Sequence, residues 1–501
     1  MDPSQPRAET SGSITMSPSL GWSSTATNTF SRPLDTTENF YRVVSETTTN
    51  NRDQWAITLS LRLAYPPSIE DLLPYLRRAW LVTRLLHPSL AGIATQTSSQ
   101  PDTSSATRIV TVGPFDEDEW LNQTFFVHPR NYTGDALVRD AKYSELPTLH
   151  WLPGTCELCF RSSHWRIDGM GMFMLANSYL NSLATFLHLG LNTSLEDVAK
   201  QAPVARGSLT PSLDDALDSY KDEDSTPESV RVAADKLIAQ YRKGIPSVGL
   251  PLTSDRAKAS PKSTYRSSLN FESTTTARIL DACKKRGFSV SAAIQSAVLR
   301  AAICYEQHPM AKSYASYFAI DLRRQLSAPW NTEEFAVGMF SSGLPLVVEN
   351  IMDGPMTFDQ VVAMVNAAYR QDRSRVHSDD HGNSVSQQQL VAPFIRRTIQ
   401  LFSDPTLRDM PPITCPDVSH LGNIENVLKR KHICDISGGV VEVEDTWLMV
   451  EVYSPAAFFH QWTFRDCLTI QASVNEAFYD REFLKDFMSK VKDELLQGLQ
   501  L

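Results

Sequence analysis

One short segment of the sequence, residues 163–169 (SHWRIDG), combines an imidazole, a carboxyl group and a glycine. A neutral imidazole such as that of His164 can accept the proton of an attacking alcohol near neutral pH and return it to a leaving group. The carboxyl group of Asp168, four residues later, lies on the same side of a tight turn and could orient the imidazole. Gly169 allows the turn to close without a Cβ clash. This segment is the strongest candidate for general acid–base chemistry.

The flanking sequence predicts a strand, a turn and a helix around this segment. Residues 148–163 are rich in apolar side chains and predict a strand that carries His164 to its end. Residues 169–189 predict a long apolar helix that leaves the turn. A second helix is expected to run to about residue 86, with Ser68 and Asp71 resembling a capping box at its start. The motif should therefore lie at the edge of a sheet, with its backbone fixed on both sides.

The chain also divides into regions of different composition. Residues 1–30 are rich in Ser, Thr and Pro without an apolar period, which predicts a disordered tail. Residues 205–263 begin with Gly, Ser, Pro and acidic clusters and predict a crossover. It would join an N-terminal lobe, 31–204, to a C-terminal lobe, 264–501. Both lobes mix strands and helices, so we expect an α/β (α+β) fold.

Composition limits the classes of partner. Of 501 residues, 42% are hydrophobic and 21% charged, as in an ordinary globular protein. The 47 Lys and Arg against 57 Asp and Glu give a net charge of −10, which argues against a nucleic-acid partner. The seven cysteines are scattered, the start lacks the features of a secretory signal, and no apolar run could span a bilayer. We expect a cytoplasmic protein with no membrane partner.

The motif His164-x-x-x-Asp168-Gly169 after an apolar strand resembles the active-site motif of the chloramphenicol acetyltransferase-like superfamily, which includes the BAHD acyltransferases and the condensation domains of peptide synthetases. Three further segments agree in order and spacing. Residues 287–294 (GFSVSAAI) resemble the helix start of the family's second half. Residues 321–323 (DLR) resemble its Asp-x-Arg strand, followed by residues 338–342 at a strand crossing between the lobes, and residues 419–422 (SHLG) resemble its Ser-x-x-Gly segment.

Two departures narrow the resemblance. Condensation domains usually carry two adjacent histidines, and Ser163 stands at the first position here. The Asp-Phe-Gly-Trp-Gly segment of plant BAHD enzymes is absent. These differences favour a stand-alone acyltransferase, and the overall pattern is most similar to the fungal trichothecene 15-O-acetyltransferase type.

The resemblance implies roles for individual residues. His164 would be the general base, and Asp168 would form a salt bridge with Arg323 that holds the loop, with Gly169 supporting the same turn. Donors for the oxyanion would be backbone N–H groups near Gly169 or the side chain of Ser419, although a turn residue is an equally open interpretation of Ser419. No covalent acyl-enzyme would form, so donor and acceptor must meet at His164 in a channel at the interface of the two lobes.

The predicted function is acetylation of a hydroxyl group on a secondary metabolite such as a trichothecene sesquiterpenoid. Acetyl-CoA, or another acyl-CoA, would be the co-substrate, with no permanently bound cofactor, no metal and a monomeric enzyme. His377 and His381 have metal-like spacing but lie in a polar, Gly-flanked loop. Two alternatives remain, namely an enzyme that takes its acyl group from a carrier-protein thioester and a repurposed, non-catalytic member of the fold. A serine hydrolase is disfavoured because no Gly-x-Ser-x-Gly is present.

Overall fold

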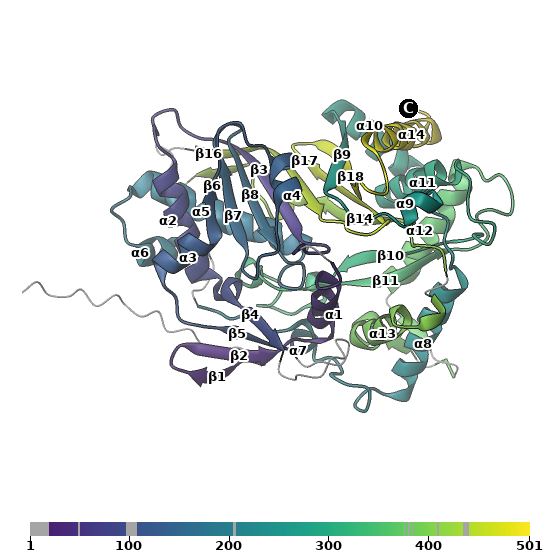
Figure 1. Cartoon of the computed structure of the whole chain (residues 1–501), viewed down its shortest axis with the longest axis horizontal. Coiled ribbons are helices and arrows are strands. Elements are labelled where there is room, and N and C mark those ends of the chain that lie inside the picture. Colours follow the sequence, from purple (N-terminus) through teal and green to yellow (C-terminus); the bar gives the residue numbers. More distant parts are fainter. Residues whose placement is uncertain are drawn as a thin grey trace, which may run out of the picture.

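Two lobes lie side by side in the computed structural model (Figure 1). The first lobe is built mainly from the N-terminal half of the chain and the second from the C-terminal half. The predicted α/β class with two lobes is confirmed. The structure describes residues 20–48, 51–96, 108–203, 207–374, 376–378, 381–382, 384–407, 410–433 and 440–501, without the side chains of 370–378 and 406.

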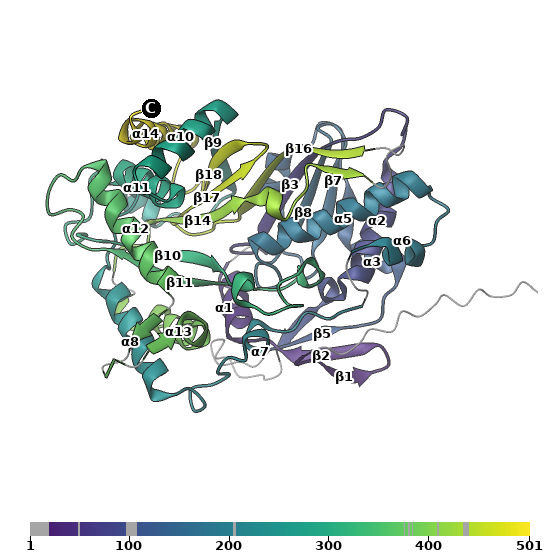
Figure 2. The same cartoon turned by 180° about the vertical axis from the view of Figure 1, so that it is seen from behind.

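The first lobe contains a six-stranded sheet. Its strands, in spatial order, are β15 (Lys431–Ile433), β16 (Val440–Val450), β3 (Ile57–Ala64), β8 (Glu157–Ser162), β7 (Thr148–Leu152) and β6 (Phe125–Val127). Helices α2 (Leu73–Leu86) and α5 (Gly169–Leu189) cover one face of this sheet (Figure 2). Leu59, Leu61 and Leu63 alternate along β3 and are buried in the core between sheet and helices. This core fixes the strand and the helix that flank the motif.

Two local predictions in the first lobe were only partly right. The apolar stretch 148–163 forms a hairpin of β7 and β8, because the chain turns at residues 153–156. Helix α2 begins at Leu73, with Pro74 in its first turn and no side-chain cap, so the predicted capping box at Ser68 and Asp71 is wrong. The Asp71 carboxylate accepts a hydrogen bond from the Leu73 backbone N–H instead, at 3.0 Å.

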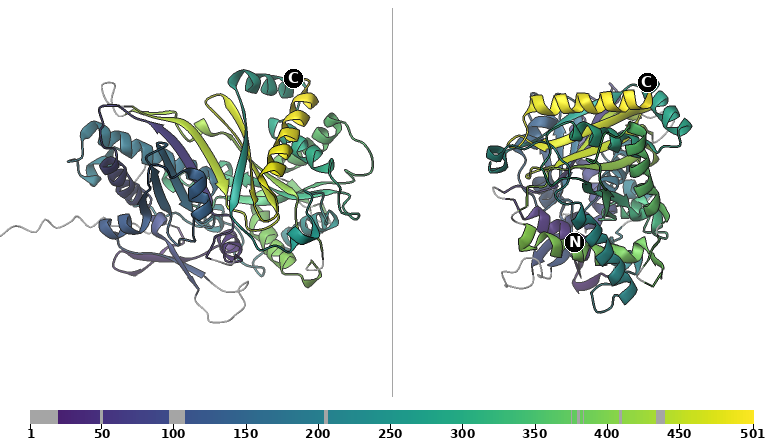
Figure 3. Two further views of the ribbon diagram at one scale, coloured as in Figure 1. Left: turned by 45° about the horizontal axis from the view of Figure 1, so that its top comes forward. Right: turned by 90° about the vertical axis from the view of Figure 1, so that its right-hand side faces the viewer.

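The second lobe contains a four-stranded sheet in the order β14 (Pro416–Asn423), β17 (Ala457–Phe464), β18 (Cys467–Asn475) and β9 (Thr264–Phe271). Beside it, β10 (Tyr314–Asp321) and β11 (Ser341–Val348) form an antiparallel pair. Four helices pack on the strands of this lobe, namely α10 (Ser273–Lys285), α11 (Val290–Ile303), α12 (Phe358–Ser374) and α14 (Arg481–Leu499) (Figure 3). The apolar side chains of these helices and strands form a second core.

The prediction that residues 1–30 form a disordered tail is partly wrong, because the end of that segment belongs to a smaller four-stranded sheet. It consists of β1 (Ser23–Ala26), β2 (Thr29–Pro33), β5 (Arg108–Val112) and β4 (Ile93–Gln96). Residues 20–30 are therefore ordered, because β2 pairs with β5 and the Trp22 indole N–H donates to the Thr210 carbonyl at 2.7 Å. The rest of that predicted tail, residues 1–19, lies outside the described residues.

The lobes are joined through two segments of the C-terminal half. Strand β16 pairs with β3 in the first sheet, and its Val441, Val443 and Met449 are buried in the first core. Residues 322–340, between β10 and β11, place Ala336 and Val337 in that same core. The prediction that residues 338–342 lie at the strand that crosses between the lobes was therefore wrong. Strand β11 pairs with β10 in the second lobe, whereas the strand that enters the first sheet is β16.

The crossover region carries helices α7 (Leu213–Leu217), α8 (Glu228–Lys243) and α9 (Ser254–Ala257), and α8 packs on α13 (Gln387–Phe402). The remaining elements are α1 (Thr36–Ser45), α3 (Glu117–Thr124), α4 (Gly134–Asp140), α6 (Leu195–Gln201), β12 (Val376–Ser378) and β13 (Ser384–Ser386). Helix α1 begins with a capping box of Asp35 and Glu38 and lies between the lobes (Figure 1). Across the described ranges, no helix is both long and apolar enough to cross a membrane.

Candidate active site

His164 lies on the loop between β8 and α5, at the junction of the two lobes. The ring of Tyr41, from α1, stacks on its imidazole with centroids 4.4 Å apart and planes 25° apart. The preceding residue, Ser163, is buried and donates its hydroxyl to the carboxylate of Asp53. The imidazole itself is half-buried, so it remains open to a ligand while its orientation is fixed from both sides.

The environment of His164 keeps its imidazole neutral. Burial is the main cause that lowers the pKa of His164 to about 4, and its own backbone carbonyl and Asp168 oppose this shift only in part. The Nδ1 atom is buried and makes no hydrogen bond of ordinary geometry within the described residues, although its own backbone carbonyl lies close by. In the tautomer that carries the proton on Nδ1, the lone pair is on Nε2. At neutral pH the ring can therefore accept a proton at Nε2, as a general base must.

The carboxylate of Asp168 holds the loop and does not contact the imidazole by a hydrogen bond. Arg323 donates from Nη1 to both carboxylate oxygens at 2.8 Å. The backbone N–H groups of Phe340 and Gly171 donate to it as well, each at 2.8 Å. Both partners of the ion pair are at most 3% exposed. The predicted Asp168–Arg323 salt bridge is confirmed, and it ties the start of α5 to the loop between β10 and β11.

Glycine is required at Gly171 more strictly than at Gly169. A Cβ atom on Gly171 would lie 2.3 Å from the Ala336 carbonyl oxygen and 3.0 Å from Nη2 of Arg323. Gly169 is the first residue of α5, is not in the left-handed region, and a Cβ there would meet Leu421 at 3.3 Å. The prediction that Gly169 avoids a Cβ clash thus applies only to the flexible end of the Leu421 side chain. The close approach of the 322–340 loop makes Gly171 the constrained position.

Ser419 lies on β14, on the second-lobe side of the junction. In the parallel pairing of β14 with β17, Ser419 is opposite His460. It is half-buried, and Gly422, which has a φ of +70°, lies within the same strand at an irregularity of this pairing. Ser419 is therefore a strand residue and not a turn residue, which leaves its hydroxyl as a candidate contact for a ligand.

A buried chain of hydrogen bonds connects β14 and β17 to helices α12 and α11. Gln461 donates to Nδ1 of His420, and the other ring nitrogen of His420 bonds to the hydroxyl of Tyr369, which bonds to Gln295. Gln295 then donates to the Tyr314 hydroxyl at 2.9 Å. Burial lowers the pKa of His420 to about 3, so its ring is neutral and the chain has one consistent direction. These bonds fix the positions of Ser419 and its neighbours.

A buried ion pair braces the strand that carries the motif. Arg161, on β8, donates from Nε to Glu451 at 2.7 Å, and the side chains are 4% and 0% exposed. The Tyr453 hydroxyl donates to the other oxygen of Glu451 at 2.7 Å. Burial raises the pKa of the neighbouring Asp53 to about 7, which the cation of Arg161 opposes. The pair therefore links the end of β16 to the base of the His164 loop.

This geometry gives a prediction for stability. Replacing Glu451 by alanine leaves the Arg161 guanidinium buried without its carboxylate, which should lower the free energy of unfolding by about 3–5 kcal/mol. Glu444, also on β16, forms an exposed pair with Arg62 at 3.3 Å, each side chain 48% exposed. Glu444→Ala should change the unfolding free energy by less than about 1 kcal/mol. Denaturant titration compares the two, and equal losses would contradict the role of the buried pair.

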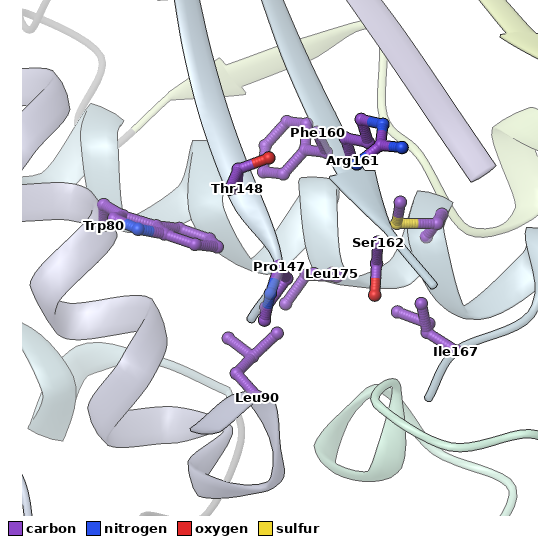
Figure 4. A pocket seen from close by; sticks show the side chains of 10 residues that line it. Trp80, Leu90, Pro147, Thr148, Phe160, Arg161, Ser162, Ile167 and Leu175 are labelled. Atoms are coloured by element: carbon purple, nitrogen blue, oxygen red, sulfur yellow. The ribbon is translucent and has the colours of Figure 1, made fainter. Parts of the chain in front are cut away.

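An apolar pocket lies beside the motif, within the first lobe (Figure 4). Its cavity volume is only about 10 Å³, which is too small for a substrate. Its lining residues are Trp80, Leu90, Pro147, Thr148, Phe160, Arg161, Ser162, Ile167, Met172 and Leu175. Figure 4 shows Trp80 and Phe160 on its sides and Ile167 of the motif at one end. His164 is not among the lining residues, so the pocket lies against the motif and does not contain the imidazole.

In the described part of the chain, no three His, Cys, Asp or Glu side chains are grouped so that they could hold a metal ion. The pair His377 and His381 cannot be placed in this respect, since the side chain of His377 and residues 379–380 lie outside the described residues.

Sequence reasoning missed two residues of the site, Tyr41 and His460. Tyr41 follows the capping box of Asp35 and Glu38, a signal that is visible in the sequence and that predicts the start of a helix. His460 lies within an apolar run with no motif around it, and only the pairing of β17 with β14 brings it to the junction.

Comparisons with known proteins extend over nearly the whole chain. No family model matches the sequence. The chain is 30% identical over 493 residues to a protein of Epichloe uncinata named loline biosynthesis cluster 1 transcription factor lolU1, across 96% of this chain and 97% of lolU1. It is 25% identical over 488 residues to the O-acetyltransferase pigM of Monascus ruber, across 96% of this chain and 88% of pigM.

A solved structure has the same fold. The TRI3 trichothecene 15-O-acetyltransferase from Fusarium sporotrichioides superposes with a TM-score of 0.73 and 16% identity, across 96% of this chain and 98% of TRI3. The match includes both lobes, which confirms the fold that the His164 motif predicted. This chain belongs to the family of fungal proteins that includes lolU1, and its fold is that of the chloramphenicol acetyltransferase-like acyltransferases.

Proposed function

We propose that the protein is an acyl-CoA-dependent O-acyltransferase in which His164 is the general base. The observation that carries the proposal is a neutral, half-buried imidazole at the junction of two lobes, on a loop fixed by the Asp168–Arg323 pair. The fold alone does not determine the activity, so the argument depends on this site. The O-acetyltransferase name of pigM, along nearly the full chain, supports the same reaction class.

The proposed reaction is a direct transfer. The hydroxyl oxygen of the acceptor attacks the thioester carbonyl carbon as Nε2 of His164 removes the hydroxyl proton. The tetrahedral intermediate then collapses, the carbon–sulfur bond breaks, and the imidazolium returns the proton to the departing thiolate. Products are an ester and free CoA, and no oxidant or metal is needed. Ser419 and the backbone N–H groups at the start of α5 are candidate donors to the oxyanion, although the Gly171 N–H already bonds to Asp168.

The proposed acceptor is a hydroxyl group on a polycyclic secondary metabolite, and the proposed acyl group is acetyl. The trichothecene acetyltransferase TRI3 shares the two-lobe fold over the full length of both chains. A sesquiterpenoid of the trichothecene class is therefore the first acceptor to test, followed by other terpenoid, alkaloid and polyketide alcohols.

A non-catalytic role is the second candidate, since lolU1 is named a transcription factor. Sequence-specific or non-specific DNA binding depends on a cationic surface, because phosphate contacts supply much of the affinity. This chain has a net charge of −10. The neutral imidazole of His164 and the Asp168–Arg323 ion pair that fixes its loop favour catalysis over regulation.

The test is an assay of the purified protein with acetyl-CoA, a thiol-detecting reagent and a panel of terpenoid, alkaloid and polyketide alcohols. The proposal predicts CoA release that depends on at least one alcohol, with the acetyl ester identified by mass spectrometry. Acyl transfer from a carrier-protein thioester, with none from CoA, would favour the condensation-like alternative. DNA binding with no transfer from either donor would favour the non-catalytic one.

The low pKa of His164 predicts the pH profile of the transfer. A base must be neutral to act, and burial favours the neutral form of His164 down to a pH of about 4. We therefore expect kcat/KM to be nearly constant from about pH 5.5 to 8. A histidine with an ordinary pKa of about 6.5 would instead lose about tenfold at pH 5.5. Such a loss, in enzyme that recovers full activity on return to pH 7.5, would contradict the neutral buried base.

A further inference from the structure

His460 lies on the face of β17 that is turned toward the first lobe. Phe458, Trp462 and Phe464 pack with the core of the first lobe, whereas Phe459 packs with the core of the second. Successive side chains of a strand point to opposite faces, so His460 shares the face of Phe458 and Trp462. It is thus a polar side chain in an otherwise aromatic row at the lobe junction.

Ring contacts connect this row to the general base. Phe458 contacts Trp55 with centroids 5.7 Å apart, and Trp55 contacts Tyr41 at 5.6 Å. Tyr41 in turn stacks on His164 at 4.4 Å. A charge on His164 also lowers the pKa of His460, which places the two imidazoles within electrostatic reach of each other. His460 and His164 therefore border the same part of the junction from opposite lobes.

The hydrogen bonding of His460 is incomplete. Its side chain is 6% exposed, and its Nδ1 is buried with no partner among the described residues. A buried polar atom without a partner costs about 1–3 kcal/mol, so its presence in a folded protein requires an explanation. The structural chain of Gln461, His420 and Tyr369 passes beside His460 without including it. The buried Nδ1 thus keeps its lone pair unshared, which leaves the ring proton on Nε2.

We propose that His460 is a catalytic residue that donates a hydrogen bond from Nε2 to the thioester carbonyl oxygen of the substrate as it becomes an oxyanion. The proposal depends on the acyltransferase function proposed above. Burial, with His164 nearby, keeps His460 neutral, so it carries one N–H and keeps its proton throughout the reaction. Ser419, directly opposite on β14, can supply a second donor to the same oxygen. The two donors face the base across the point where the tetrahedral intermediate forms.

An oxyanion donor acts mainly on kcat, and removing one typically costs about 10²–10³-fold. We expect His460→Leu to lower kcat by that factor with KM changed less than about threefold. His460→Gln, which keeps an N–H donor at similar reach, should recover part of the loss. A matched control is His432→Gln, since His432 is 1% exposed and bonds to Asn181 at 2.9 Å within the first lobe. The control should retain wild-type kcat.

The measurement is steady-state acetyl transfer by wild type and the three variants, with melting temperatures recorded for each. Full kcat in His460→Leu, with wild type active, would overturn the role of His460 and leave the acyltransferase function standing. A raised KM with unchanged kcat would likewise overturn it, because it would assign His460 to ground-state binding. If His460→Leu does not fold, His460→Gln decides, and a kcat below one hundredth of wild type would contradict rescue by a donor. An inactive wild type would overturn both proposals.

Discussion

Replacing His164 by alanine should lower kcat for acyl transfer by about 10²–10⁴-fold while leaving the protein folded. The loss is large because the imidazole of His164 is the group proposed to accept the hydroxyl proton. The fold should survive because the side chain is half-buried on a loop and its main contact is the Tyr41 ring.

The control for this variant is His188→Ala. His188 is exposed near the end of α5, so its removal should change neither kcat nor the melting temperature. If His164→Ala kept more than about a tenth of wild-type kcat, His164 would not be the base.

The second large effect is expected at the Asp168–Arg323 pair. Asp168→Ala leaves a buried guanidinium without its carboxylate and removes the acceptor of two backbone N–H groups, so it should cost about 3–5 kcal/mol of unfolding free energy. Arg323→Ala should cost less, because the Phe340 and Gly171 N–H groups still bond to the carboxylate. Both variants should lose activity, since the pair holds the His164 loop.

A double-mutant cycle isolates the interaction itself. The double variant should lose less stability than the sum of the single losses, by about 0.5–3 kcal/mol. Denaturant titration of the four proteins gives this coupling. The exposed pair Lys285 and Asp281, 74% and 57% exposed, provides a control cycle in which a coupling of at most about 0.5 kcal/mol is expected. Strictly additive losses at Asp168 and Arg323 would show that their contact does not stabilise the protein.

The sequence predicted best those elements whose signals are local. Helix α5 has the predicted limits because apolar side chains predominate from Gly169 to Leu189 and no proline interrupts them. The motif turn was equally visible, since the strand, His164, Asp168 and the helix are contiguous. The salt bridge to Arg323 was predicted from the family resemblance and not from local pattern.

What the sequence did not predict is set by long-range pairing. Strand β17 reads as an apolar run, and nothing local shows that alternate residues serve two different lobes. His460 thus gained its position only from the pairing with β14. Strand β16 likewise has its place in the first lobe only through its pairing with β3, far away in the chain. Tyr41 had a visible helix start before it, and only the tertiary fold brings its ring onto His164.

The central claim is direct transfer from acyl-CoA to an alcohol with His164 as the base. It is tested most directly by mixing the protein with isotopically labelled acetyl-CoA, first without and then with the accepted alcohol. We predict no labelled protein in the intact mass before the alcohol is added, and labelled ester afterwards with wild type but not with His164→Ala. A stable acetylated protein that passes its label to alcohol after acetyl-CoA has been removed, or undiminished transfer by His164→Ala, would contradict the mechanism.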